Sequence, residues 1–178
     1  PKQLHANYYA QLNLQSTYPD GLTAGTTATN ISVANAAVRG RPVAHALSFE
    51  AKDLGDSKYL IAASFINGGS VHFVPRCTAE LSTAQNMQIV RKLLDGKTTM
   101  MLPFESRSFS ATFDLSSINP GVYRLSAEMD YGAAVPLPAK PKAVKVDLDP
   151  TDPEKKRKLL TVINAAEFEG QAGTNWNQ

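Results

Sequence analysis

The chain has 178 residues, of which 43% are hydrophobic and 8% aromatic, so it can bury one substantial core and wholesale disorder is excluded. Charged residues make up 19% and the net charge is +2, which leaves no basic arm for a nucleic acid. Its apolar runs are short, and this predicts no transmembrane segment. The single cysteine, Cys77, excludes an internal disulfide framework and a cysteine-based zinc site.

Segment 1–43 predicts two strands around one turn. The chain opens at Pro1 without a Met or an apolar leader, so we expect a processed product or a fragment of a longer protein. From Ala6 to Leu14 apolar residues alternate with polar ones, which predicts a strand with one buried face. Residues 18–21 contain the Pro and Gly of a tight turn, and residues 22–34 predict a polar strand. We expect this segment to complete a sandwich with the following strands, or to be the edge of a preceding domain.

Residues 44–132 carry the patterns of a β-sandwich core. Residues 58–67 are apolar on both faces, which is typical of a central strand, and residues 67–70 have the composition of a hairpin turn. Further strands are predicted over 44–51, 71–81, 87–94, 107–115 and 122–131. Short strands at this spacing, joined by Gly, Pro and Asn turns, favour an all-β antiparallel sandwich of the immunoglobulin-like type.

The pattern changes after Gly132. Residues 133–150 contain three prolines up to Pro141 and predict a Pro-rich linker or an edge strand. Thr151 and Glu154 have the spacing of a capping box, so we expect a C-terminal helix over 151–170, followed by a polar tail over 171–178. The predicted fold is therefore a sandwich with a helical appendage.

One short segment resembles the tyrosine corner of Greek-key sandwiches. Pro120 and Gly121 form a turn that delivers Tyr123 to the start of a strand, where its hydroxyl is expected to bond back to the preceding loop. The favoured role of these three residues is structural.

Residues 58–132 together resemble a bacterial extracytoplasmic immunoglobulin-like module. The features that carry the resemblance are "FINGGSVHFVP", "LPFESRSFSATFDL" and "INPGVYRLSAEMDYG". Similar modules occur in pilus-chaperone-like periplasmic proteins and in cell-surface proteins. The resemblance implies a periplasmic, cell-surface or secreted location. No residue here matches the basic pair of pilus chaperones, so none is carried over.

The sequence shows no catalytic or metal-binding constellation. His5, His45 and His72 lack metal-ligand spacing, and no nucleophile motif is present. Asp147, Asp149 and Asp152 alternate as in a calcium loop, but the Gly and the closing Glu are missing. We therefore predict a non-enzymatic protein without cofactor or metal.

The C-terminal segment is the predicted partner-binding site. On the expected helix, Leu159, Ile163 and Phe168 belong to an apolar stripe that needs a surface to cover it. A basic cluster precedes them: Lys155, Lys156, Arg157 and Lys158. This cluster would steer the segment toward an acidic partner, or else it is an ordinary solvated face.

Two functions remain open at this point. The first is an extracytoplasmic structural or assembly module that binds another protein, or another copy of itself, through strand edges and terminal segments. The second is a carbohydrate-binding or adhesion sandwich. That function requires exposed aromatic side chains, and the candidates are Tyr8, Tyr9, Tyr18, Tyr59 and Trp176.

Overall fold

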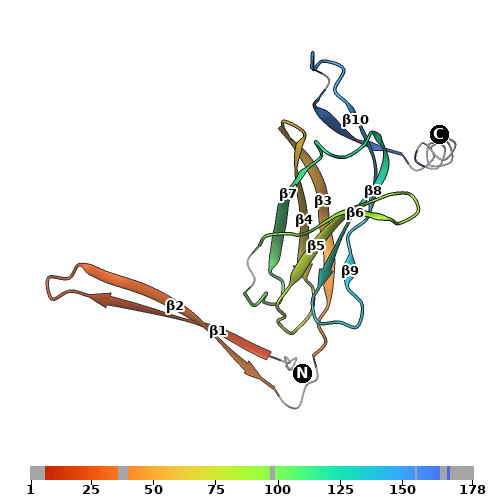
Figure 1. Cartoon of the computed structure of the whole chain (residues 1–178). Coiled ribbons are helices and arrows are strands. Elements are labelled where there is room, and N and C mark those ends of the chain that lie inside the picture. Colours follow the sequence, from red (N-terminus) through yellow and green to blue (C-terminus); the bar gives the residue numbers. More distant parts are fainter. Residues whose placement is uncertain (1–6, 36–39, 97–98, 155, 165–167, 169–178) are drawn as a thin grey trace.

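The computed structural model describes residues 7–35, 40–96, 99–154, 156–164 and 168. The fold is all-β, and every strand pairing in this part of the chain is antiparallel. Its strands divide between a long two-stranded ribbon and a body of two facing sheets (Figure 1). We call the ribbon the arm; it consists of β1 (Asn7–Thr17) and β2 (Thr23–Ala34).

The body consists of a smaller and a larger sheet. The smaller has the order β3-β4-β7, and the larger has the order β11-β10-β8-β5-β6, with β9 pairing with β8. The strand bounds are β3 Ala44–Gly55, β4 Lys58–Asn67, β5 Arg76–Ser82, β6 Gln88–Leu93, β7 Ser106–Asp114, β8 Gly121–Asp130, β9 Leu137–Pro138, β10 Lys142–Leu148 and β11 Lys158–Ile163.

Both sheets contribute to one hydrophobic core. The smaller sheet supplies alternate residues of β4 and β7, and the larger supplies alternate residues of β5, β8 and β10. The largest fully buried side chains include Ile61, Phe65, Phe109, Phe113, Leu81, Leu125, Met129 and Val144. The alternation in the sequence therefore predicted the inward faces of β7 and β8, and the central position of β4 between β3 and β7 is confirmed.

The turn at residues 67–70 does not form the expected hairpin. Strand β4 pairs with β3 and β7, whereas β5 belongs to the other sheet, so the chain crosses between sheets here. The Nδ2 group of Asn67, which is fully buried, donates to the carbonyls of Val71 (2.8 Å) and Met101 (3.1 Å). Its Oδ1 accepts from the amide of Gly69 at 2.9 Å. The sequence correctly predicted a turn at these residues, but the predicted pairing of β4 with the strand that follows the turn is wrong.

The expected C-terminal helix is wrong over residues 158–163, which form strand β11 beside β10. The carboxylate of Asp152 accepts from the backbone amides of Lys156 and Arg157, at 2.7 Å each, so the turn is held in a non-helical form. Strand pairing then covers Leu160 against Val146, which a helix would not do. Of the segment after Asn164, only Phe168 belongs to the described residues, and the predicted tail over 171–178 lies outside them.

The Pro-rich segment continues the larger sheet. Strand β9 pairs with Glu128 and Met129 of β8, and β10 lies between β8 and β11. In the described part of the chain, no helix is long and apolar enough to cross a membrane.

Side-chain hydrogen bonds join the two sheets on both lateral sides of the body. On one side, the backbone amides of Lys158 and Leu160 in β11 donate to Ser57 Oγ (2.7 Å) and Tyr59 Oη (2.9 Å) of the smaller sheet. On the other side, Lys92 Nζ of β6 donates to the carbonyl of Thr112 in β7 at 2.8 Å. These bonds occupy groups that could otherwise recruit a foreign strand.

Candidate functional site

The arm has one apolar and one polar face. Residues directly opposite each other in an antiparallel pair lie on the same face, and Tyr8 pairs with Val33, Ala10 with Ile31, and Leu12 with Thr29. The apolar face therefore consists of Tyr8, Ala10, Leu12, Leu14, Thr27, Thr29, Ile31 and Val33. The opposite face carries Asn7, Tyr9, Gln11, Asn13, Gln15, Thr26, Ala28, Asn30, Ser32 and Ala34.

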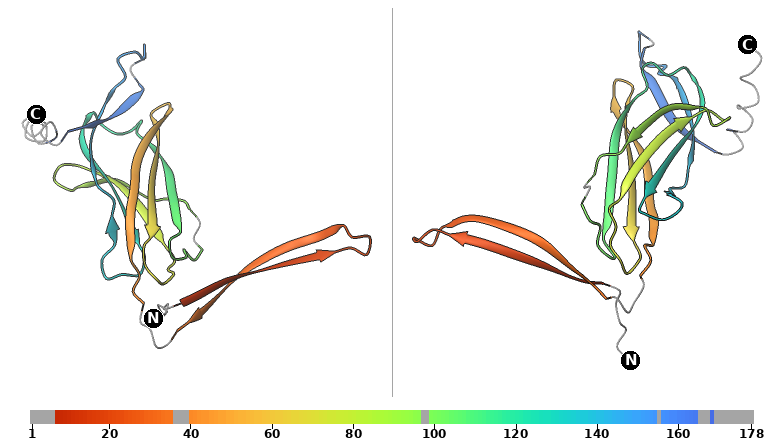
Figure 2. Two further views of the ribbon diagram at one scale, coloured as in Figure 1. Left: turned by 180° about the vertical axis from the view of Figure 1, so that it is seen from behind. Right: turned by 60° about the horizontal axis from the view of Figure 1, so that its bottom comes forward.

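The apolar face is open to solvent. Its five large side chains, Tyr8, Leu12, Leu14, Ile31 and Val33, are 45–58% exposed. The strands of the arm pair only with each other among the described strands, and the arm stands clear of the body in further views (Figure 2). The expectation that segment 1–43 completes the sandwich with a buried face of β1 is therefore wrong.

Charge is almost absent from the arm. Within residues 7–34 the only charged side chain is Asp20, at the tip. Its Oδ1 accepts from the amide of Leu22 at 3.0 Å and shapes the turn, in which Gly21 has a φ of 86°. Soluble proteins usually protect exposed strands with charges, particularly lysine, so an uncharged ribbon with an apolar face is typical of an interaction element.

Tyr9 joins the base of the arm to the body. Its hydroxyl accepts from the backbone amide of His72 at 2.8 Å and lies 3.1 Å from Nδ1 of the same histidine. The two rings pack edge to face with centroids 5.7 Å apart. This contact explains the position of His72, which therefore serves the architecture of the junction.

A pocket of about 330 Å³ lies at this junction, between the base of the arm and the body. Phe104 lines it with Tyr9 and Asn7, and is 77% exposed at a φ of 62°. A positive φ is costly for a phenylalanine, so the surrounding loop must hold it there. The backbone amide of Phe104 donates to the carbonyl of Asn67 at 2.7 Å, which fixes one end of the loop.

A buried arginine fixes the rest of that loop. The side chain of Arg107 is 7% exposed and pairs with the carboxylate of Glu105. The guanidinium also donates to the carbonyls of Thr99 (2.7 Å) and Met100 (3.1 Å), while Glu105 accepts from the amide of Leu102 at 2.8 Å. These hydrogen bonds hold the loop on both sides of Phe104 and fix the position of its backbone.

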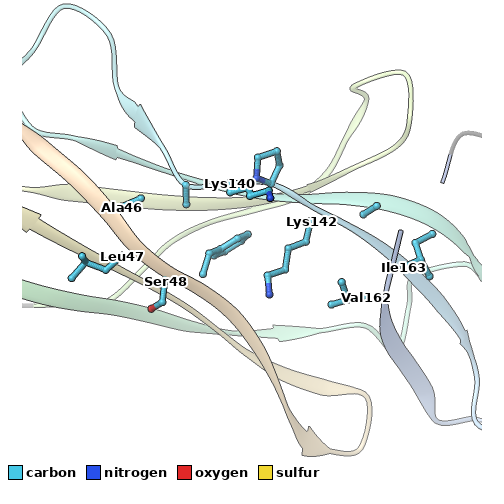
Figure 3. Close-up of a pocket in the computed structure, with 11 residues that line it drawn as sticks. Ala46, Leu47, Ser48, Lys140, Lys142, Val162 and Ile163 are labelled. Atoms are coloured by element: carbon cyan, nitrogen blue, oxygen red, sulfur yellow. The ribbon is translucent and has the colours of Figure 1, made fainter. Parts of the chain in front are cut away.

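A second hollow, of about 630 Å³, lies between β3 and the strands β10 and β11. Its walls are mostly apolar, and Lys140 and Lys142 are the only charged residues among those that line it. Figure 3 shows the side chain of Lys142 between Ser48 of β3 and Val162 of β11. Leu47, at a register shift in β3, also lines this hollow.

The predicted basic cluster does not form a free cationic patch in the described residues. Arg157 forms ion pairs with Asp53 (2.7 Å) and Asp149 (3.4 Å), and Lys156 pairs with Glu154 at 2.7 Å. The amide of Lys158 is bound to the body, as described above, and Lys155 lies outside the described residues. Of these charges, the guanidinium of Arg157 joins the turn before β11 to β3, and the steering role of the cluster stays a prediction.

The predicted apolar stripe is also dispersed. Leu159 and Ile163 lie half-buried in β11, and Ile163 lines the hollow beside β3. Phe168 lies beneath the guanidinium of Arg124, whose Cζ is 6.0 Å from the ring centroid. Leu159 and Ile163 are four residues apart and therefore still share one face of β11, whereas Phe168 does not belong to this strand.

The three residues that the sequence predicted to have a structural role lie at the start of β8. The hydroxyl of Tyr123 donates to the carbonyl of Asn119 at 2.8 Å, around the turn formed by Pro120 and Gly121. Burial raises the pKa of Tyr123 above its usual value. This is the geometry of a tyrosine corner.

Cys77 is buried in β5, on the same face as Phe73 and Pro75. Burial, with a smaller contribution from Glu128, raises the pKa of its thiol to about 12. A thiol in this state is a poor nucleophile at neutral pH. Among the described residues, no group of three or more His, Cys, Asp or Glu side chains could hold a metal ion. Asp149, a calcium candidate, instead accepts from the amide and hydroxyl of Thr151 at 2.8 and 2.7 Å.

No protein-family model matches this chain. No curated protein matches it significantly. The sequence did not predict that the arm stands free of the body. The available signal was two strands of nearly equal length around one turn, with a single charge between them. No signal in the sequence indicated the conformation of Phe104.

Proposed function

We propose that this chain is a non-enzymatic, extracytoplasmic assembly module that binds another protein through the apolar face of its arm. The observation that carries the proposal is the combination of exposed apolar side chains and missing charge over the whole length of β1 and β2. An isolated two-stranded ribbon is only marginally stable in water. A protein surface laid over its apolar face would supply the missing packing layer.

The arrangement of the body supports the arm as the docking element. The outward amides of Lys158 and Leu160 in β11 are bound within the chain, and Lys92 bridges β6 to β7. Strand addition at these edges would have to displace those bonds. A partner that docks on the apolar face of the arm displaces no such bond.

We further propose an immunoglobulin-like topology for the body. The neighbours β3-β4-β7 and β5-β8-β10 support this proposal, because they follow the order of a seven-stranded sandwich of this type; β6 departs from that order by pairing with β5 instead of β7, and β11 is an addition. The bond from Tyr123 to Asn119 lies where such sandwiches place a tyrosine corner. The resemblance of residues 58–132 to extracytoplasmic modules supports the same assignment and is the ground for the proposed location.

The decisive experiment places a photo-cross-linking amino acid on each face of the arm. Benzoylphenylalanine is introduced in place of Leu12, on the apolar face, or in place of Asn13, on the polar face. In cells that produce the full protein, we expect a protein adduct from position 12 and a much weaker one from position 13. Equal adducts, or none from position 12, would contradict docking through the apolar face.

A glycan-binding site is the second candidate, and the pocket at the base of the arm favours it. Phe104 and Tyr9 supply aromatic surface there, and Asn7 and Ser70 supply hydrogen-bonding groups. Of the aromatic residues suggested by the sequence, Tyr59 is buried, Tyr8 and Tyr18 are exposed, and Trp176 lies outside the described residues. Loss of a glycan-array signal on Phe104→Ala would support this function, and a blank array for the unaltered protein would reject it.

A further inference from the structure

We infer that the protein covering the arm is the arm of a second copy, packed face to face and antiparallel about a two-fold axis. This inference rests on the proposed function, because it names the partner of the same surface. It follows from three properties of the arm: its charge pattern, its dimensions and the residues at its midpoint.

The charges of the arm are complementary when two copies run antiparallel. Asp20 lies at the tip, and the base of the arm lies beside Arg41, whose carbonyl approaches Gly69 in the wall of the junction pocket. Arg41 is exposed, and neither it nor Asp20 forms an ion pair within the described residues. A two-fold axis through the middle of the arm brings each tip over the other base, so both pairs of opposite charges meet.

The dimensions fit a weak but specific dimer. Strand β1 has 11 residues, which gives a ribbon about 37 Å long and about 10 Å wide. The footprint is then about 350 Å² per copy, or about 700 Å² for both copies together. This area is below the standard size of a stable interface, so we expect a weak dimer with dissociation in the micromolar range or above.

The axis passes close to Leu12, which lies near the middle of β1 on the apolar face. The two copies of Leu12 would therefore pack near each other in a region without charge. The polar face, with Asn13 and Gln11, would remain in water. A charged residue at position 12 would meet its own copy across the axis, whereas the same charge at position 13 would not.

Sedimentation velocity over a concentration series tests this arrangement on the full chain. We expect the unaltered protein to dimerise, Leu12→Asp to weaken the dimer more than tenfold, and the matched control Asn13→Asp to change it less than threefold. Circular dichroism and melting of the body should be the same in all three, which excludes misfolding as the cause. A protein that stays monomeric at high micromolar concentration, or a dimer indifferent to Leu12→Asp, would overturn the inference.

A charge swap tests the antiparallel direction. Asp20→Lys and Arg41→Glu are each expected to weaken the dimer about threefold to tenfold, and the double variant should restore it, because opposite charges meet again. A double variant weaker than either single one would overturn the antiparallel arrangement. In the cellular cross-linking experiment, an adduct of two copies supports the inference. An adduct with a different protein overturns it but leaves the proposed function standing, and no adduct from position 12 contradicts the proposed function itself.

Discussion

The hydroxyl of Tyr123 donates a hydrogen bond of 2.8 Å to the backbone carbonyl of Asn119, four residues earlier in the chain. The ring is buried in the core, so this bond ties the loop before β8 to the packing between the sheets. Tyr123→Phe should lower the free energy of unfolding by about 1 kcal/mol through the lost bond. Tyr123→Ala should lower it by about 3–5 kcal/mol through the added cavity. Urea denaturation measures both, and Tyr18→Phe, at an exposed position, should change nothing.

The loop before β7 depends on one buried cation. Arg107→Met removes its bonds to Thr99 and Met100 and its ion pair with the carboxylate of Glu105. We expect a loss of about 2 kcal/mol or more, measured by urea denaturation, and faster proteolysis within residues 99–105. Arg91→Met removes an exposed ion pair with Glu128 and should cost less than about 1 kcal/mol. An equal loss of unfolding free energy in the two variants would show that the buried contacts of Arg107 stabilise the fold no more than an exposed ion pair does.

The backbone of Phe104 is strained. Its φ of 62° suits asparagine better than phenylalanine, and its side chain contributes little packing at 77% exposure. We therefore expect Phe104→Asn to raise the free energy of unfolding by up to about 1 kcal/mol. Val74→Asn, at an exposed position without a positive φ, is the control and should bring no such gain. A destabilised Phe104→Asn variant would mean that the ring packs more strongly than its exposure indicates.

The turn before β11 should weaken in acid. Hydrogen bonds from the hydroxyl and then the amide of Thr151 hold the pKa of Asp149 below its ordinary value, and Arg157 adds a smaller effect. Because the folded-state pKa is the lower one, the group stabilises the fold fully above the unfolded pKa of about 3.9. That contribution is lost as the pH falls through the folded-state pKa. In Asp149→Asn, the fall of the unfolding free energy below that pH should be shallower than in the unaltered protein.

The thiol of Cys77 should react only when the protein unfolds. Its pKa of about 12 leaves almost no thiolate near neutral pH, and the side chain is 1% exposed. Labelling with a disulfide reagent is expected to be slow in buffer and complete in denaturing urea. Cys77→Ser should lower the melting temperature without weakening the dimer, since Cys77 lies in the buried core of the body and not on the apolar face of the arm. Rapid labelling of the native protein would contradict the burial.

The body could be predicted further from the sequence than the ends of the chain. Alternation alone identified the inward faces of β7 and β8, because each is buried on one side by a complete core. The same alternation in β1 does not indicate burial, since a pattern of period two gives two faces but does not say what covers them. A pattern also cannot report sheet membership, so the crossing at Asn67 was taken for a hairpin.

The C-terminal error has a local cause. Thr151 and Glu154 have the spacing of a capping box, but the carboxylate of Asp152 accepts hydrogen bonds from the following amides instead. Of the apolar partner residues predicted on that helix, Leu159 and Ile163 still share a face of the strand, but Phe168 lies outside it. The apolar face of the arm depends instead on the register of one strand pair, which a sequence alone does not fix.

Strand β11 is bonded to the larger sheet through β10, and to the smaller sheet through Tyr59, Ser57 and the ion pair of Arg157 with Asp53. A pull on the chain after Ile163 is therefore shared between the two sheets of the body. Tension applied there would load the sandwich as one unit, and separation of β11 from β10 alone would not release it. At the other end, the hydrogen bond and the ring contact between Tyr9 and His72 join β1 to the body, so tension on the arm reaches the body through this contact as well as along the chain after β2.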